Sequence, residues 1–339
     1  MPTKTLNIAV IGAGRIGKIH AENLATRITG ARLAGVADVN LGAAQALASQ
    51  FHVPVATADY LHLLAAPDIQ AVAICSATDT HAQIIQEAAA HGKHIFCEKP
   101  IDLDLKRIRQ ALEAVNKAGV KFQVGFNRRF DPSFAKAREM VAAGKIGAPH
   151  LLRISSRDPG PPPLSYVKVS GGIFMDMTIH DFDMVRFLSG SEAVEVFAIG
   201  DALVDPEIGR AGDVDTCVVT LRLANGALAT IDNSRKAVYG YDQRVEVFGS
   251  AGMVAVSNRT PDNHVLLNAE CVSSSKPQHF FLERYVEAYV VELRQFVDCV
   301  LNDRTPTVGG QDGLMACVLG LAAKKSLQEK RPVQVSEIQ

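Results

Sequence analysis

The sequence predicts two α/β domains, a doubly wound parallel sheet over residues 1–125 and an α+β domain with a mainly antiparallel open sheet over residues 126–339. Up to Gly125, short apolar runs alternate with helical patterns, which is typical of parallel strands joined by crossover helices. Beyond Gly125, the runs alternate apolar with polar residues and are separated by Gly, Asn and Asp, which is typical of antiparallel strands. A glycine-rich turn between the first strand and the first helix is the third observation.

Parallel strands bury both faces, so the strands of the first domain read as continuous apolar runs. They are expected at 6–11, 33–37, near 55, at 71–75, at 94–97 and at 121–124. The helices between them include 42–50, 81–91 and 103–118. Ile108, Leu112 and Val115 recur at helical spacing in the last of these helices, and Gly119 follows as a C-terminal stop.

The second domain is expected to be a sheet followed by two helices. Its strands are predicted at 151–156, 194–199, 217–223, 228–234, 244–248, 253–257 and 265–268. Asn225-Gly226 between two of them is the best hairpin signal in the chain. Helical periodicity returns at 285–301 and 314–327. One face of such a sheet stays open to solvent and offers a surface for self-association.

The glycine turn has the sequence GAGRIG at 12–17 and lies between a strand and a helix. Gly12 permits the tight turn, Gly14 lets a pyrophosphate approach the backbone, and Gly17 lets the helix pack closely on the strand. The free N–H groups of the first helical turn then face the phosphate. This pattern predicts a dinucleotide-binding Rossmann domain.

Asp38 ends the second expected strand, about twenty residues beyond the last glycine, where a carboxylate accepts hydrogen bonds from the adenosine ribose. Its charge would repel a 2′-phosphate, and no Arg follows it directly, so we expect NAD rather than NADP. The alternative is that the glycines only make a tight connection and that Asp38 only caps the next helix.

Composition excludes several classes of protein. Lys plus Arg number 35 against 36 Asp plus Glu, so no strong field recruits nucleic acid or an acidic membrane surface. The 6 Cys are scattered singly without a CxxC pair, which argues against a zinc site or a disulfide framework. The longest apolar run, 314–323, is too short to span a bilayer. The first strand follows the initial Met closely and leaves no room for a signal peptide, so a cytoplasmic protein is expected.

Lys99 follows the fifth expected strand in the sequence Cys97-Glu98-Lys99-Pro100. This places it at the carboxyl edge of the sheet, where ligands of open α/β folds bind. Pro100 restricts the backbone of Lys99, so the lysine is held in a defined direction as a cationic donor to a substrate oxygen. The alternative is a solvated lysine in a loop.

Asp176 and His180 lie in the stretch GGIFMDMTIHDFD at 171–183. If a helix begins near Asp176, the two residues are four apart and share one face. A carboxylate beside an imidazole orients the ring and favours its protonated form, as a general base requires. The alternative makes Asp176 a helix cap and His180 a half-buried neighbour of Met184 and Phe187.

These groups suit the oxidation of a secondary alcohol by NAD, which takes a hydride while a base removes the hydroxyl proton. We expect His180 to accept the proton, Asp176 to orient it, and Lys99 to stabilise alkoxide character. No metal is expected, because the histidines are dispersed and no Cys pair supports them.

Further candidates follow strands. Ser76, Thr78 and His81 come after the fourth expected strand and could line the nicotinamide side. Arg128 follows the sixth strand, and Asp158 and Tyr239 lie in loops of the second domain, where a surface tyrosine is an equal alternative. The remaining histidines, His20 among them, have no second group to support them in the sequence.

With these motifs, the chain resembles the glucose-fructose oxidoreductase and inositol dehydrogenase (Gfo/Idh/MocA) family over its whole length. GAGRIG, EKP, GFNRRFDP, SRDPGPPPLSYVKVSGG and GGIFMDMTIHDFD carry the resemblance and are most similar to those of inositol 2-dehydrogenases. It implies a homotetramer built through the open sheet and NAD-dependent oxidation of myo-inositol to 2-keto-myo-inositol. On that similarity the catalytic residues are Lys99, Asp176 and His180, and the other substrate contacts are Arg128, Asp158 and Tyr239. The expected cofactor contacts are Gly12, Gly14, Arg15, Ile16, Gly17, Asp38, Ser76, Thr78, His81 and Glu98.

Two alternatives remain. Scyllo-inositol or a pyranose such as glucose could be the substrate instead. A cofactor-sensing regulator on the same scaffold would bind in the same place without reacting, and such a protein could dispense with the base and the lysine.

Overall fold

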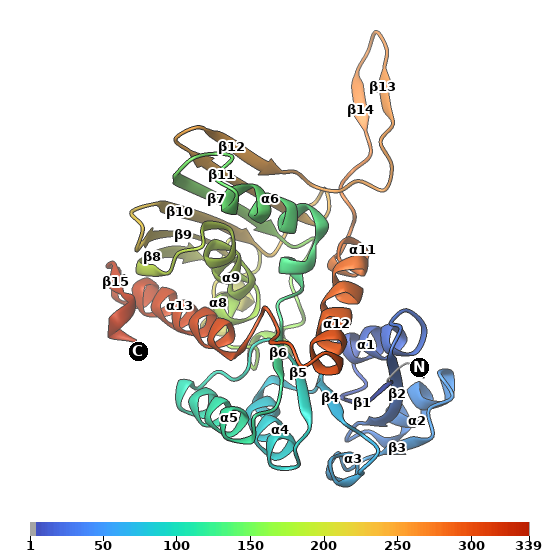
Figure 1. The fold of residues 1–339 in the computed structure, drawn as a ribbon. Helices are drawn as coiled ribbons and strands as arrows, with labels where there is room; N and C mark the ends of the chain where they lie inside the picture. The colour runs from blue at the N-terminus through green and yellow to red at the C-terminus, as the bar shows by residue number, and fades with distance from the viewer. Residues whose placement is uncertain (1–4, 339) are drawn as a thin grey trace. The chain divides into compact units, whose positions relative to one another are not determined.

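The computed structural model of the chain describes residues 5–338, and they form two compact units (Figure 1). The first unit combines the residues up to Phe130 with Glu287–Met315. The second combines Asp131–Val286 with the residues from Ala316 onward. Each unit has its own sheet.

The sheet of the first unit has six parallel strands in the order β3-β2-β1-β4-β5-β6. The strands are β1 (Leu6–Ile11), β2 (Ala31–Ala37), β3 (Val55–Thr57), β4 (Ala71–Ile74), β5 (His94–Glu98) and β6 (Phe122–Gly125). The helices between them are α1 (Arg15–Thr26), α2 (Leu41–Gln50), α3 (Leu61–Ala65), α4 (Thr78–Ala90) and α5 (Leu105–Ala118). The predicted doubly wound sheet is confirmed, and its strand order reverses between β1 and β4, where such folds bind ligands.

Helix α12 (Val286–Leu301) belongs to the first unit except for its first residue, although it lies far along the chain. Its side chains Val290, Leu293 and Phe296 are buried in one cluster with Ile8 of β1 and Leu24 of α1. The compact units therefore differ from the expected division at residue 125, because this apolar helix face finds its core among the parallel strands. Hydrophobic periodicity shows that a face is buried but not which sheet buries it.

The second unit contains a seven-stranded sheet in the order β12-β11-β7-β10-β9-β8-β15. The strands are β7 (Pro149–Arg157), β8 (Ala193–Asp201), β9 (Thr216–Leu223), β10 (Leu228–Ser234), β11 (Asp242–Gly249), β12 (Gly252–Val256) and β15 (Val333–Gln334). All neighbouring pairs are antiparallel except β7 with β10. A separate hairpin pairs β13 (Val265–Leu267) with β14 (Val272–Ser274). This confirms a mainly antiparallel second sheet.

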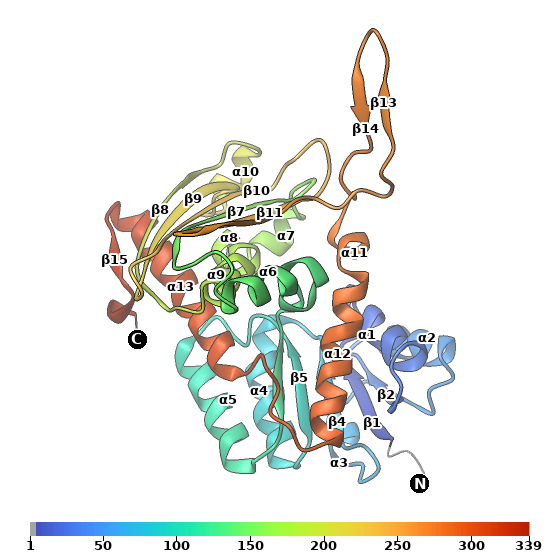
Figure 2. The ribbon, with the colours of Figure 1, turned by 45° about the horizontal axis from the view of Figure 1, so that its top comes forward.

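Helices cover one face of this sheet (Figure 2). They include α6 (Pro132–Ala142), α9 (Thr178–Ser189) and α13 (Gly310–Glu329), of which the residues from Ala316 belong to this unit. Shorter helices are α7 (Leu164–Val167), α8 (Ile173–Asp176), α10 (Pro206–Arg210) and α11 (Phe281–Arg284), and the 3-10 segments are η1 (Asn127–Phe130, in the first unit) and η2 (Val335–Glu337). The strand residues on the opposite face include the exposed apolar side chains Val218, Leu228 and Phe248.

Helix α6 was not among the expected elements, although its start carries a signal. Asp131 caps it by accepting hydrogen bonds from the N–H groups of Ser133 (3.0 Å) and Phe134 (3.2 Å), and Pro132 occupies the first helical position. An Asp followed by Pro before a periodic segment is a helix start. Among the described residues, no helix is long and apolar enough to cross a membrane.

Candidate active site

The turn after β1 requires glycine at two positions for steric reasons. A Cβ on Gly12, whose φ is +103°, would lie 2.5 Å from the carbonyl carbon of Cys75. A Cβ on Gly17 would lie 1.8 Å from the carbonyl oxygen of Gly12. A Cβ on Gly14 would meet nothing within 4 Å, so open space lies beside the start of α1. No side chain caps that start, and Arg15 and Ile16 are its first residues, so its N–H groups suit a pyrophosphate.

Asp38 follows β2 and is fixed beside the same turn. Its Oδ2 accepts a hydrogen bond from the N–H of Ala13 (2.7 Å), and its Oδ1 accepts one from the N–H of Asn40 (2.8 Å). The cap of α2 is Asn40, which accepts from the N–H of Ala43 (3.3 Å), so Asp38 does not have the capping role of the alternative interpretation. A carboxylate held beside the glycine turn fits the ribose of a dinucleotide.

Ser76, Thr78 and His81 lie where β4 leads into α4. The Ser76 and Thr80 hydroxyls are hydrogen-bonded (2.7 Å), and Thr78 is the first residue of the helix. His81 is buried, and its Nδ1 and Nε2 lie 2.8 Å from the carbonyl oxygen of Pro100 and 3.1 Å from that of Ser76. Burial lowers the pKa of this imidazole, and a neutral ring carries one N–H, so it donates to only one of these two carbonyl oxygens at a time. Its contact with nicotinamide stays a prediction.

Glu98 ends β5 and Lys99 follows it, joined to Pro100 by a cis peptide bond. Oε1 of Glu98 lies 2.6 Å from Nε2 of His20, which comes from α1. The expectation that His20 lacks a supporting group was therefore wrong. Its spacing from other buried residues of α1, three after Gly17 and four before Leu24, was the signal that its ring turns inward.

Arg128 lies in η1, after β6, and is buried with 4% of its surface exposed. The neighbouring Arg129 donates a hydrogen bond to Asp312 (2.8 Å). The substrate contact predicted for Arg128 stays a prediction.

The expectation of one helix carrying both Asp176 and His180 was wrong. Asp176 ends α8, Met177 interrupts the helix, and α9 begins at Thr178. No side chain caps α9, so Asp176 does not act as its cap. Asp176 instead accepts hydrogen bonds from the Tyr166 hydroxyl at Oδ1 (2.9 Å) and from Nη1 of Arg235 at Oδ2 (3.0 Å). Its carboxylate is thus held in position by residues outside its own helix.

Arg235 is the residue that the sequence reasoning missed. It follows β10 and is only 1% exposed, and Nη2 lies 4.0 Å from Oδ2 of Asp213. A buried guanidinium is costly unless it is paired, so its placement beside Asp176 is a specific feature of this site. No local signal reveals it, because Ser234-Arg235-Lys236 reads as an ordinary strand end and Asp176 is distant in sequence.

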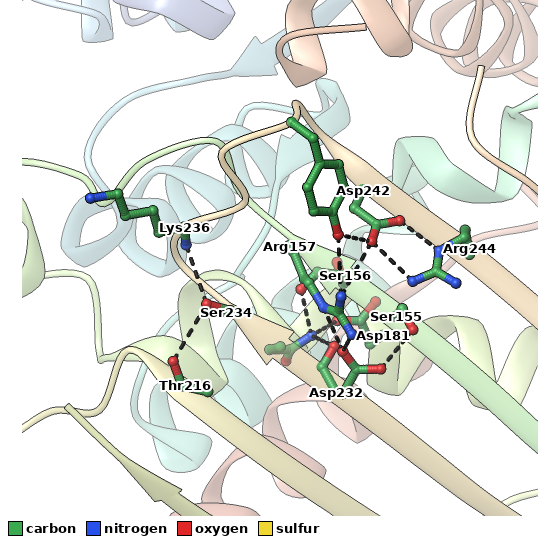
Figure 3. A network of polar contacts seen from close by, with 12 residues as sticks. Ser155, Ser156, Arg157, Asp181, Thr216, Asp232, Ser234, Lys236, Asp242 and Arg244 are labelled. Atoms are coloured by element: carbon green, nitrogen blue, oxygen red, sulfur yellow. Dashed lines mark hydrogen bonds and ion pairs between the residues drawn. The ribbon is translucent and has the colours of Figure 1, made fainter. Parts of the chain in front are cut away.

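A polar network in the second unit joins Arg157 to Asp232 and Asp242 (Figure 3). The Tyr239 hydroxyl donates to Asp242 (2.5 Å) and accepts from Nη1 of Arg157 (3.2 Å). Burial and the bond to Asp242 raise the pKa of Tyr239. Asp158 joins the same region through its backbone, which pairs with Ser234 (2.9 Å). Both substrate contacts stay predictions.

Tyr239 also lines a pocket of about 350 Å³ within the second unit. The pocket is further lined by Val238, Gly240, Pro261, Ser275, Lys276, Pro277, His279 and Glu283. One group of three side chains in residues 5–338 has ligand atoms close enough to share a metal ion: His20, Glu98 and Glu292.

Family models and known relatives place the chain in the same family. Residues 6–126 match the family model described as "Oxidoreductase family, NAD-binding Rossmann fold", and residues 134–255 match the "GFO/IDH/MocA C-terminal domain". The chain is 51% identical to a myo-inositol 2-dehydrogenase of Thermotoga maritima, covering 98% of this chain and 99% of the relative. It is 46% identical to an inositol 2-dehydrogenase of Rhizobium meliloti, covering 98% and 100%.

A solved structure with ligands is also similar. The scyllo-inositol dehydrogenase of Lactobacillus casei with bound NAD(H) and scyllo-inositol matches with a TM-score of 0.92 and 34% identity, covering 98% of this chain and 100% of that one.

Proposed function

Because this chain belongs to the GFO/IDH/MocA family of NAD-binding oxidoreductases, we propose that it oxidises myo-inositol to 2-keto-myo-inositol with NAD as the hydride acceptor. The observation that carries this proposal is the 51% identity, over nearly the whole length of both chains, to a relative named myo-inositol 2-dehydrogenase. Asp38 and the space beside Gly14 support NAD as the cofactor.

Each catalytic role is assigned to a residue of this chain. When bound, NAD accepts the hydride from the carbinol carbon. His180 accepts the hydroxyl proton, and Asp176 orients its imidazole and stabilises the imidazolium that results. Lys99 donates a hydrogen bond to the substrate oxygen and stabilises its alkoxide character until the carbonyl forms. Arg235 and Tyr166 support this assignment, because they hold the carboxylate of Asp176.

The turnover of a panel of polyols tests which substrate the protein prefers. Myo-inositol, scyllo-inositol and glucose are each incubated with the protein and NAD, and NADH formation is followed. Myo-inositol should give the highest kcat/KM. The similarity to a scyllo-inositol dehydrogenase supports scyllo-inositol as the second candidate. No turnover of any inositol or pyranose would contradict the proposal.

His180→Ala separates an enzyme from a cofactor-sensing regulator. The enzyme should lose roughly two to four orders of magnitude in kcat, because a positioned general base contributes about that much. His62→Ala is the matched control, since His62 is exposed on α3, and its kcat should be unchanged. A regulator would keep NAD binding and show no turnover to lose.

Asp38→Ala tests the cofactor preference. The carboxylate is proposed to accept from the ribose hydroxyls, so its loss should lower kcat/KM with NAD about tenfold, with little loss for NADP. Steady-state rates with both cofactors measure this. Wild-type protein that is more efficient with NADP would overturn the preference for NAD.

The oligomer proposed here is a homotetramer built through the open face of the second sheet. Its support is the set of exposed apolar side chains there, which includes Val218, Leu228 and Phe248. Light scattering should give about four times the chain mass of 36.4 kDa. Phe248→Asp should give a smaller particle, and a monomeric wild type would rule the tetramer out. A cytoplasmic location stays a prediction.

A further inference from the structure

Three ionisable groups from three separate elements meet inside the first unit. His20 comes from α1, Glu98 from the end of β5, and Glu292 from α12. One ligand atom of each lies within 4.8 Å of the others, and Nε2 of His20 is 2.6 Å from Oε1 of Glu98. The side chain of His20 is 0% exposed, that of Glu98 is 12% exposed, and Glu292 is 0% exposed. The proposed reaction assigns no role to His20 or Glu292.

Glu292 is the unusual member. Neither of its carboxylate oxygens has a hydrogen-bond partner among residues 5–338, although the residue is fully buried. Burial and the charge of Glu98 hold its pKa well above the usual range, so it carries a proton at neutral pH. Cys75 and Cys97 are the nearby thiols, and burial raises the pKa of both, so they stay neutral.

Glu98 is confined on several sides. Glu98 pairs with Gly125 of the neighbouring strand β6. A Cβ on Gly125 would lie 3.1 Å from three atoms of the Glu98 carboxylate. The imidazole of His20 is hydrogen-bonded to Glu98 and is itself packed edge-on against Phe96, with ring centroids 5.0 Å apart. The glycine turn begins the helix that carries His20, and Lys99 directly follows Glu98. The His20–Glu98 bond therefore ties the phosphate-binding element to the strand end that presents the lysine.

We propose that His20 is a positioning residue that fixes Glu98 through its hydrogen bond, and through Glu98 the end of β5, so that Lys99 is held in register with the glycine turn. This rests on the proposed function, which gives Lys99 its role. Neither His20 nor Glu292 is expected to touch substrate or cofactor. Misplacing a catalytic group by about 1 Å is enough to lower a rate on the order of 100-fold.

A divalent cation is the competing account of three ligand atoms so close together. Two ligands of one tetrahedral zinc ion lie roughly 3.3 Å apart, given metal–ligand bonds near 2.1 Å. The 2.6 Å separation of His20 and Glu98 is instead a hydrogen-bond distance. The geometry thus favours a direct bond, and metal binding is an outcome that the experiment must be able to detect.

The test compares two variants of His20 in the full-length protein. His20→Phe keeps an aromatic ring beside Phe96 but removes the nitrogen, whereas His20→Gln keeps an N–H donor for Glu98. His20→Phe should lower kcat about 10- to 100-fold while the Kd for NADH, measured by fluorescence, changes less than about threefold. His20→Gln should recover most of kcat. Equal losses in both variants, or a Kd that rises in parallel with the loss of kcat, would overturn the proposal.

Two further variants keep the test decisive if His20→Phe does not fold. Gly125→Ala should displace the Glu98 carboxylate and give the same loss of kcat. Glu292→Gln copies the protonated acid, so kcat should stay within about twofold of wild type. A large loss in Glu292→Gln would contradict the proposal. So would one equivalent of metal in the purified protein whose removal by EDTA abolishes activity.

If the proposed function is wrong, the wild-type protein will turn over no polyol, and this result separates that failure from a failure of the positioning role. In that case amide hydrogen exchange of residues 94–101 still tests the positioning role. Exchange in this segment should rise in His20→Phe and stay at the wild-type level in His20→Gln. Unchanged exchange in His20→Phe would overturn the positioning role by itself.

Discussion

Each unit of this chain holds one carboxylate, Glu292 or Asp176, in surroundings that differ sharply. In the first, Glu292 is fully buried beside Glu98 and no side chain in the described part of the chain donates to it, so a proton removes its charge. In the second, Asp176 accepts from the guanidinium of Arg235 and from the hydroxyl of Tyr166. The first group thus has no hydrogen-bond donor among the residues described, whereas the second is held by a cation and a hydroxyl.

The difference matches the work that each carboxylate is proposed to do. Asp176 is proposed to orient His180, and the hydrogen bonds from Arg235 and Tyr166 hold it in place for that role. Glu292 has only to fill space beside Glu98, and a second negative charge there would repel the first. Burial alone therefore does not predict the surroundings of a carboxylate, because one of these two has a cationic donor and the other has none within residues 5–338.

Arg235→Met should have the largest effect on this comparison, because it gives Asp176 the cation-free surroundings of Glu292. Without Arg235 the carboxylate is held less firmly, so kcat should fall on the order of 100-fold. The free energy of unfolding should fall by about 3 kcal/mol, since one member of a largely buried pair is lost. Urea unfolding and steady-state kinetics measure both.

Arg235→Lys is the control, because it keeps the positive charge but lacks the planar guanidinium. Compared with Arg235→Met, it should recover part of the free energy of unfolding but little of kcat. If Arg235→Met keeps wild-type kcat and stability, the guanidinium has no part in holding Asp176, and the contrast between the two units disappears.

Glu292→Gln tests whether Glu292 is protonated in the folded protein, through the pH dependence of the free energy of unfolding. An acid whose folded pKa is raised above the ordinary value of 4.5 keeps its proton when folded and loses it when unfolded. Wild-type stability therefore falls as pH rises from about 4.5 towards the folded pKa, by at most about 1.4 kcal/mol per pH unit.

The Gln variant lacks this dependence, so its advantage over wild type in the free energy of unfolding should grow between pH 5 and pH 8. Urea titrations of both proteins at each pH measure the difference. A difference that stays constant with pH would mean that Glu292 is ionised in the folded protein.

The sequence predicted the parallel sheet closely, because apolar runs bounded by glycine are local signals that parallel strands cannot avoid. The strand 6–11 was placed to the residue, and the glycine turn and Asp38 were found from spacing alone. The division of the chain into units was less accessible. Nothing local in α12 tells which sheet its apolar face will meet, and its core partners are hundreds of residues away.

The same limit applies to the candidate site. Asp176 and His180 stay predicted site residues, proposed from one contiguous motif, whereas the break at Met177 and the pairing with Arg235 depend on contacts that the motif does not contain. Glu292 did leave a signal. It lies three residues after Tyr289 and four before Phe296, both buried, so a carboxylate on the apolar stripe of a helix was visible in the sequence.

The smallest expected effect is that of replacing Tyr239. Its hydroxyl contacts charged groups in a solvent-exposed setting, which adds a third case to those of Glu292 and Asp176. Its side chain is 38% exposed, and its hydroxyl joins Asp242 to Arg157. Water screens such a pair, so Tyr239→Phe should change the free energy of unfolding by no more than about 1 kcal/mol. If Tyr239 also contacts the polyol, KM should rise several-fold at nearly constant kcat, because a lost ground-state hydrogen bond weakens binding without changing the base. Unchanged KM would remove Tyr239 from the substrate site and leave it as a bridge between two charged groups of the second sheet.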